Sequence, residues 1–206
     1  MIPQSISQKK LLAVEGKDDV EFFEALLKDM KIGDCEICEV GGKDQFKHKI
    51  PALVKVPGFS NVQRLGIIRD ADKNPSAAFD SIVNILKKEK INGKSLVVPP
   101  KINQFGRGTI KIGIYLMPGK LQQGMLEDLC LKTVENQPAM KCVDVFVECA
   151  SDLKKKPRNL SKTKVQTYLA AMPEIVNSLG IGAKKGYWNF GSSELNDLKS
   201  FLEKMK

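Results

Sequence analysis

The sequence predicts one α/β domain in which a mostly parallel central sheet is flanked by helices, with a helical C-terminal elaboration. Short apolar runs rich in β-branched residues, such as RLGIIRDAD (Arg64–Asp72), alternate with longer stretches in which apolar residues recur at helical spacing. Turn dipeptides, PG at 57–58 and NP at 74–75, bracket that run. The 206 residues suffice for one substantial core. Because strands joined through helices pair in parallel, this order of elements indicates a βαβ-type sheet.

The elements follow one another in a simple order. Strands are expected in 11–15 (LLAVE), 35–40 (CEICEV), 64–70 and 110–119, and a short strand-like run in 95–98 ends at two prolines. Helices are expected in 20–30, 46–54, 75–90, around 127, in 139–150, in 164–172 and from 193 onward. In the helix at 139–150 the apolar face is formed by Val143, Phe146, Val147 and Ala150. The motif-bearing core then covers about 9–135, and 136–206 is the helical elaboration of the same domain.

Two carboxylates follow the run at 64–70. Side chains alternate along a strand, so Asp70 and Asp72 are expected to point the same way just past its C-terminal end, where open α/β sheets bind ligands. Like charges at this spacing repel unless a proton or a cation lies between them, and hard oxygen ligands suit Mg²⁺ or Mn²⁺. The alternative is an acidic turn that caps the next helix, with Asp72 or Asn74 as the cap and Pro75 at the first helical position.

A second apolar run, LLAVEGKDD (Leu11–Asp19), also ends in an acid. Glu15 closes the run, Gly16 permits a tight exit, and a helix follows with Asp18 and Asp19 in its first turn. Two strands that each deliver a carboxylate at one end of a sheet can build one site. The alternative for the two aspartates is favourable placement near the positive end of the helix dipole.

The two motifs together resemble the toprim domain, a module shared by topoisomerases, primases, OLD-family nucleases and small ribosomal-RNA maturases. Its signature is a Glu after the first strand and an Asp-x-Asp after a later one, and the matching catalytic residues are Glu15, Asp70 and Asp72. OLD-family nucleases also carry an acid where Asp19 stands, and OLD-like proteins carry a further acid in the region of Glu127. Most of the chain is similar to small bacterial toprim-like proteins related to OLD-family nucleases. The resemblance implies a Rossmann-like toprim fold with Mg²⁺ (or Mn²⁺) at these five acids; for Glu127, simple placement at a helix N-terminus is the alternative.

Basic residues outnumber acidic ones by 33 to 24, which gives a net charge of +9. This balance favours polyanionic partners such as nucleic acid, and a merely basic solvated surface is the alternative. Candidate nucleic-acid contacts lie in basic or glycine-rich stretches, and they are Lys43, Arg107, Lys162, Lys164, Lys184 and Lys185. Lys43 follows a glycine pair (41–42) whose backbone can approach a phosphate, and a plain turn is the alternative. Arg107 stands between two glycines in a loop that can cover the site, and a plain hairpin connection is the alternative.

The cysteines give only a weak signal for a zinc or redox site. Cys35 and Cys38 have the spacing of a zinc or redox pair, but no second pair follows, and a strand would turn them to opposite faces. An odd count of five cysteines and the lack of a signal peptide indicate a reduced, cytoplasmic protein. No apolar stretch is long enough to span a bilayer, so no membrane partner is expected.

The leading functional hypothesis is metal-dependent hydrolysis of phosphodiester bonds in nucleic acid by a toprim-type nuclease. Three alternatives stay open. In the first, the chain is a module that binds nucleic acid or a nucleotide without cleaving it. In the second, it is a subunit that acts with a separate ATPase, because it has no GxxxxGK[ST] motif of its own. In the third, its acids are only structural. DNA and RNA, endonuclease and exonuclease action, and any oligomeric state are all compatible with the sequence.

Overall fold

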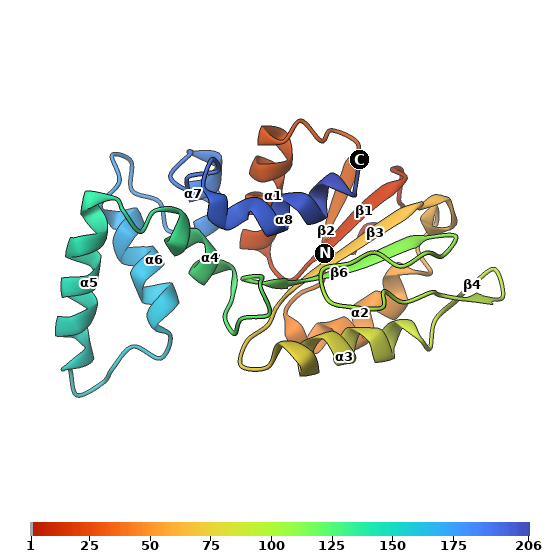
Figure 1. Ribbon diagram of the computed structural model, residues 1–206, viewed down its shortest axis with the longest axis horizontal. Helices are drawn as coiled ribbons and strands as arrows, with labels where there is room; N and C mark the ends of the chain where they lie inside the picture. Colours follow the sequence, from red (N-terminus) through yellow and green to blue (C-terminus); the bar gives the residue numbers. More distant parts are fainter. Residues whose placement is uncertain (1) are drawn as a thin grey trace.

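The computed structural model describes residues 2–206 and is built on a four-stranded parallel sheet (Figure 1). Its strands are β1 (Lys10–Val14), β2 (Cys35–Glu39), β3 (Arg64–Asp70) and β6 (Lys111–Met117). The order in space is β2-β1-β3-β6, and all three pairings are parallel. The predicted fold class is therefore confirmed. The strand expected in 95–98 is wrong beyond Ser95, because only a two-residue hairpin forms there, β4 (Lys90–Ile91) with β5 (Lys94–Ser95).

Helices cover both faces of the sheet. One face carries α2 (Phe46–Leu53) and α3 (Pro75–Leu86), and the other carries α1 (Lys17–Asp29) and α8 (Asn196–Glu203) (Figure 1). The other helices are α4 (Leu126–Thr133), α5 (Pro138–Ser151), α6 (Leu160–Ala170) and α7 (Leu179–Lys184), and 3₁₀ turns occupy Lys43–Gln45, Phe59–Asn61 and Ser193–Leu195. Within residues 2–206, no helix has the length and apolar character needed to cross a membrane.

The alternation of side chains along β1 explains the two buried clusters. Leu12 and Val14 pack on the α1 and α8 side, whereas Leu11 and Ala13 pack on the α2 and α3 side. Since both faces of a parallel sheet are buried, its strands read as continuous apolar runs rather than as alternating ones. This is why the strands were recognisable in the sequence as short apolar stretches.

The strand order reverses between β1 and β3. The chain leaves β1 through α1 to reach β2 on one side, and then returns through α2 to place β3 on the other side of β1. Such a switch point leaves a crevice beyond the carboxyl ends of the two strands, which is where open α/β sheets bind ligands. Glu15, which follows β1, and Asp70, which ends β3, therefore lie at the mouth of one crevice.

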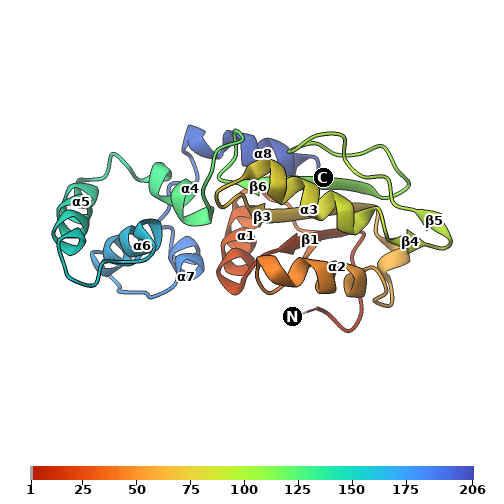
Figure 2. The ribbon, with the colours of Figure 1, turned by 90° about the horizontal axis from the view of Figure 1, so that it is seen from below.

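The helices α5 and α6 extend away from the sheet, with α4 and α7 between them and the core (Figure 2). The inner face of α5 buries Met140, Val143 and Val147. Phe146, by contrast, is 53% exposed. The apolar face predicted for this helix is therefore correct at Val143 and Val147 and wrong at Phe146.

Candidate active site

Glu15 follows the last residue of β1 and lies beside the end of β3. The two strands are in register from Lys10 opposite Arg64 to Ala13 opposite Ile67. Beyond that pair the glutamate side chain bridges them, because its Oε2 accepts a hydrogen bond from the backbone N–H of Asp70 at 3.2 Å. The predicted convergence of the first strand's acid on the third strand's acid is thus present in the structure.

Asp70 is the last residue of β3 and points toward the N-terminus of α4. Its Oδ1 accepts a hydrogen bond from the backbone N–H of Leu126 at 3.0 Å. Leu126 is the first residue of α4, where unpaired N–H groups and the helix dipole favour negative charge. The next residue, Glu127, therefore lies close to Asp70, and its negative charge is among the causes that raise the pKa of the Asp70 carboxyl.

Asp19 enters from the first turn of α1. Its Oδ2 accepts a hydrogen bond from the backbone N–H of Gly16 at 3.1 Å, which is the return half of a helix capping arrangement. This bond holds the carboxylate against the same short segment that contains Glu15. Asp19 therefore does lie at a helix N-terminus, as the alternative expected. Its carboxylate also lies close to the carboxylates of Glu15 and Glu127.

These four carboxylates line one pocket of about 400 Å³ beyond the sheet. The pocket is lined by Glu15, Gly16, Lys17, Asp18, Asp19, Gly42, Asp70, Leu126, Glu127, Lys162 and Leu179. It lies at the switch point, and its walls come from β1, β3 and the first turns of α1, α4, α6 and α7. Residues from position 15 to position 179 of the chain therefore build a single site.

Crowding of like charges shows in the acid–base properties of the pocket. Burial, with the neighbouring Glu15 and Glu127 charges, raises the pKa of Asp19 to about 7. Burial is also the main cause that raises the pKa of Asp70, followed by the charges of Asp19, Glu15 and Glu127. The pKa of Glu15 is raised by its burial as well. Such carboxylates stay close together only if protons or cations neutralise them.

The donor set fits a hard divalent cation, because it consists of carboxylate oxygens without His or Cys. The side chains do not form a ready coordination sphere, since in residues 2–206 no group of three His, Cys, Asp or Glu is arranged to hold an ion. Three of the acids are instead held by backbone N–H groups. A cation here would be held partly through water, or after small side-chain rotations, as Mg²⁺ commonly is.

Asp72 lies at the edge of this site rather than in its lining. The chain leaves β3 at Asp70, and Asp72 takes a left-handed conformation with φ of 51°. Its backbone N–H and C=O pair with Gly124 at 2.9 and 2.8 Å, and its Oδ2 lies 3.3 Å from Lys43 Nζ. Side chains stop alternating where β3 ends, so Asp70 and Asp72 do not point the same way, although the Asp72 charge still contributes to the raised pKa of Glu15.

Two of the six predicted basic contacts stand at the site. Lys162, at the start of α6, places its Nζ 3.2 Å from Glu127 Oε1, and this charge raises the pKa of the lysine. Lys43 pairs with Asp72 near the other side of the acids. Both lysine side chains are more than half exposed, at 64% and 52%. They are therefore free to exchange their carboxylate partners for a phosphate.

The other four basic candidates are not part of the pocket. Lys164 pairs with Asp144 at 2.6 Å, Lys184 with Glu24 at 2.8 Å, and Lys185 with Glu174. Arg107 lies near the opposite end of the sheet, since the neighbouring Gly106 bonds to Ile112 at the start of β6. The expectation that the Arg107 loop covers the acids is thus not met by this arrangement.

The glycine pair before Lys43 fits the alternative of a plain turn rather than a phosphate contact. The N–H groups of Gly41 and Gly42 both donate to the backbone carbonyl of Glu15, at 2.9 and 2.8 Å, so they fix the end of β1 instead of facing a phosphate. A contact that sequence reasoning missed joins Ser178, the N-cap of α7, to the carboxylate of Asp18. Its only sequence signal was a serine at a helix start, which names no partner.

Comparison with known proteins places this site in context. A family model described as "Protein of unknown function (DUF3226)" matches residues 9–206. A hypothetical protein from Pyrococcus horikoshii OT3 is similar in structure, with 18% sequence identity, a TM-score of 0.53, and coverage of 97% of this chain and 99% of that chain. At this identity the likeness shows a shared fold. No curated protein matches the chain.

Two further solved structures are more distant. They are the C-terminal regions of the OLD proteins of Burkholderia pseudomallei and of Xanthomonas campestris pv. campestris. The Burkholderia region has 10% identity, a TM-score of 0.47, and coverage of 98% of this chain and 100% of that chain. The Xanthomonas region has 12% identity, a TM-score of 0.46, and coverage of 96% of each chain.

Proposed function

The chain belongs to the DUF3226 family of proteins of unknown function, and we propose that it is a toprim-type nuclease that hydrolyses phosphodiester bonds in nucleic acid with Mg²⁺ or Mn²⁺. The observation that carries the proposal is the convergence of Glu15, Asp19, Asp70 and Glu127 on one pocket at the switch point of the sheet. Four mutually repelling carboxylates are costly to bury without a counter-charge. A divalent cation is the counter-charge that suits an all-oxygen set.

The metal would be held by Glu15 and Asp70 from adjacent strands, with Asp19 and Glu127 alongside and Asp72 at the edge. When bound, Mg²⁺ or Mn²⁺ supplies neutralisation of charge on a scissile phosphate and favours departure of the leaving oxygen. The match of Glu15, Asp70 and Asp72 to the toprim signature supports this set, because Glu15 and Asp70 meet at the ends of β1 and β3 and Asp72 lies at the edge of the same site.

Side chains and helix N-termini of the chain would bind the substrate and move the proton. Lys162 and Lys43 are exposed cations next to the acids, so they can bind the phosphate oxygens and orient the substrate backbone. The N-termini of α1 and α4, which face the pocket through Gly16 and Leu126, favour additional negative charge. As an alternative to binding the metal, Glu15, whose pKa is raised by burial, is the candidate to accept a proton from an attacking water.

The test is cleavage of supercoiled plasmid DNA and of structured RNA at low salt, with and without Mg²⁺ or Mn²⁺. We expect wild-type protein to cut, and Asp70→Asn to lose cutting because it removes one carboxylate charge without changing side-chain shape. The matched control is Asp34→Asn, since Asp34 is exposed and pairs with Lys10 at the other end of the sheet.

Each outcome has a distinct meaning. Equal cutting by wild-type protein and Asp70→Asn would overturn the proposal. Metal and nucleic-acid binding without cutting would instead indicate a binding module, or a subunit that requires a separate ATPase. Stability that does not respond to metal, together with no affinity for nucleic acid, would make the acids structural.

A further inference from the structure

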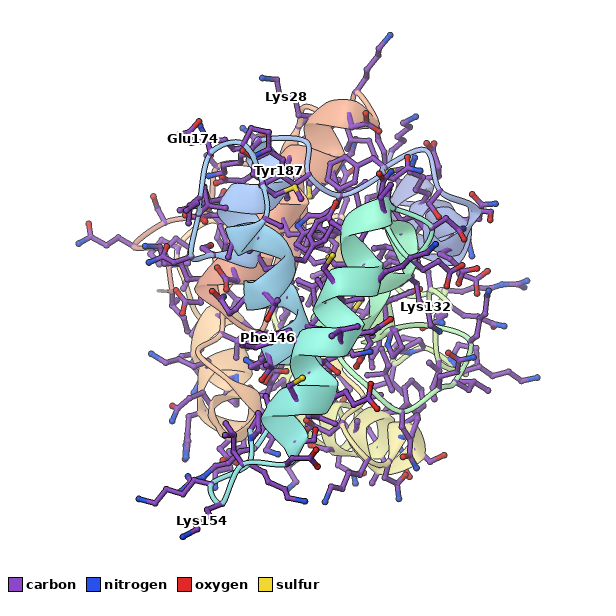
Figure 3. The ribbon with its side chains drawn as sticks, turned by 90° about the vertical axis from the view of Figure 1, so that its left-hand side faces the viewer. Lys28, Lys132, Phe146, Lys154, Glu174 and Tyr187 are labelled. Atoms are coloured by element: carbon purple, nitrogen blue, oxygen red, sulfur yellow. The ribbon has the colours of Figure 1, made fainter. Side chains whose placement is uncertain are left out.

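The outer side of α5 carries an exposed apolar stripe at the end of the molecule farthest from the sheet (Figures 2 and 3). The stripe consists of Pro138, Cys142, Val145, Phe146 and Cys149, with Leu153 just past the helix end. Val145, Phe146 and Leu153 are 60%, 53% and 57% exposed. The helix thus has two apolar faces, and within residues 2–206 only the inner one is covered. From this stripe and the charges beside it, we propose that α5 is a self-association surface that packs antiparallel against α5 of a second copy.

The order of residues in the stripe is symmetric about the bond between Val145 and Phe146. At 100° per residue, all six side chains fall within about 50° of one line along the helix. A twofold axis at that point places Cys142 opposite Cys149 of the second copy, and Val145 opposite Phe146. It also places Pro138 opposite Leu153. The stripe is therefore self-complementary in an isologous contact, which is the kind that closes a dimer.

The charges beside the stripe select the same partner and the same direction. Lys141, Glu148 and Asp152 follow one flank of the helix, and in the part of the chain that the structure describes none of them has an ion-pair partner. The twofold axis brings Lys141 opposite position 150, between Glu148 and Asp152 of the second copy, and it does so twice. A parallel pairing would instead place this flank of the two copies on opposite sides of the contact, so that Lys141 would meet neither Glu148 nor Asp152 of the second copy.

The surface is separate from the proposed active site. No residue of α5 lines the pocket of carboxylates. Substitutions on the stripe can therefore change association while the acids stay unaltered.

The first test is the mass of the full-length protein in solution, by light scattering after gel filtration and by sedimentation. We expect a dimer for wild-type protein and a monomer for Phe146→Glu, because a charge at the centre of the contact would be desolvated twice. The matched control is Ile175→Glu, at a 73% exposed residue between α6 and α7, and it should remain a dimer. Unchanged circular dichroism and melting temperature would show that both variants fold.

The charge pattern offers an independent variant. Lys141→Glu should weaken the dimer, and the triple change Lys141→Glu/Glu148→Lys/Asp152→Lys should restore it, because the facing charges are then exchanged. A solely structural effect of Lys141→Glu would not be rescued by reversing the charges of its predicted partners.

The cysteines report the direction of packing. With diamide as the oxidant, wild-type protein should form a crosslinked dimer through Cys142 and Cys149. Cys142→Ser and Cys149→Ser should each fail to crosslink alone, and an equal mixture of the two should crosslink. Crosslinking of either single variant alone, a dimer that Phe146→Glu leaves intact, or a wild-type monomer at high concentration would each overturn the proposal.

Discussion

The two ends of the central sheet treat acidic side chains in opposite ways. At the amino end, Lys10 Nζ lies 2.7 Å from Oδ2 and 2.8 Å from Oδ1 of Asp34. This hydrogen bond lowers the pKa of Asp34. At the carboxyl end, burial and like charges raise the pKa of Asp19 and Asp70. At the amino end, a lysine of the chain neutralises the carboxylate. At the carboxyl end, the nearby lysines do not offset the burial and mutual repulsion of the carboxylates. The difference supports the proposal that a cation binds at the carboxyl end.

Removal of an acid should have very different effects on the cleavage rate at the two ends of the sheet. Asp70→Ala should lower the rate of metal-dependent cleavage by at least about 100-fold, because it removes several kcal/mol of charge stabilisation. Asp34→Ala should leave the rate unchanged, since Lys10 already neutralises Asp34 at the far end of the sheet. Initial rates at saturating metal and substrate would measure both, and equal losses would remove the distinction between the two ends.

Metal should also stabilise the protein in a way that requires no activity. At pH 8, Mg²⁺ at 100 times its dissociation constant should raise the free energy of unfolding by about 2.7 kcal/mol. Asp19→Asn/Asp70→Asn should lose this gain, and Asp34→Asn should keep it. Urea denaturation with and without Mg²⁺ would measure it; a gain that survives the double substitution would place the metal elsewhere.

Without metal, stability should depend on pH with a defined sign. The pKa of Asp19 is about 7 in the folded protein and 3.8 when unfolded, so the folded state binds more protons between those values. The free energy of unfolding should therefore fall as the pH rises from 5 to 8. The expected change is on the order of 1–2 kcal/mol, less than the full pKa shift implies, because Asp19 keeps some contact with solvent.

Asp19→Asn should flatten this dependence. Asp34→Asn should leave it in place, because the pKa of Asp34 is lowered and its titration lies at more acidic pH. Denaturation at several pH values in the presence of a chelator would measure the slopes. A metal-free protein that is most stable at pH 8 would contradict the prediction.

At the carboxyl end of the sheet, Asp72 should contribute less to cleavage than Asp70. Asp72 pairs with Lys43 at the edge of the site and does not line the pocket. We expect Asp72→Ala to slow cleavage by about tenfold, which corresponds to about 1.4 kcal/mol and is clearly less than for Asp70→Ala. Parallel rate measurements on the two variants decide this, and an equal loss would place Asp72 among the principal metal ligands.

The smallest expected effect concerns the lysines. Lys162→Ala should weaken nucleic-acid binding severalfold and reduce the slope of log affinity against log salt by about 1, as loss of one phosphate contact does. Lys184→Ala is the control, since Lys184 pairs with Glu24 outside the pocket. Fluorescence anisotropy across a salt series would measure both slopes. Identical slopes for the two variants would remove Lys162 from the interface.

The sheet and the main acids were predictable because strong local patterns carry them. Buried parallel strands read as short apolar runs, and Glu15 and Asp70 stand where such runs stop. Asp72 was misplaced because alternation ends with the strand, and a left-handed residue follows. The pairing of Lys185 with Glu174 depends on a loop path that no local pattern encodes.

The face of α5 was ambiguous for a different reason. Helical spacing predicts that apolar residues share a side, but this helix has two apolar sides, and Phe146 belongs to the outer one. Periodicity identifies a stripe and not the element that covers it. Only the packing of α6 against α5 decides which stripe is inside.

The position of α8 has a consequence for the order in which the protein can acquire its core during synthesis. Phe201, Leu202 and Met205 are completely or almost completely buried, and Phe201 packs against Tyr115 of β6. The part of the sheet face that α8 covers, beside α1, therefore stays open until residues beyond 195 have left the ribosome. The acids between 15 and 127 precede this closure, so a nascent chain that already contains all of them still exposes an apolar face, and early release invites aggregation.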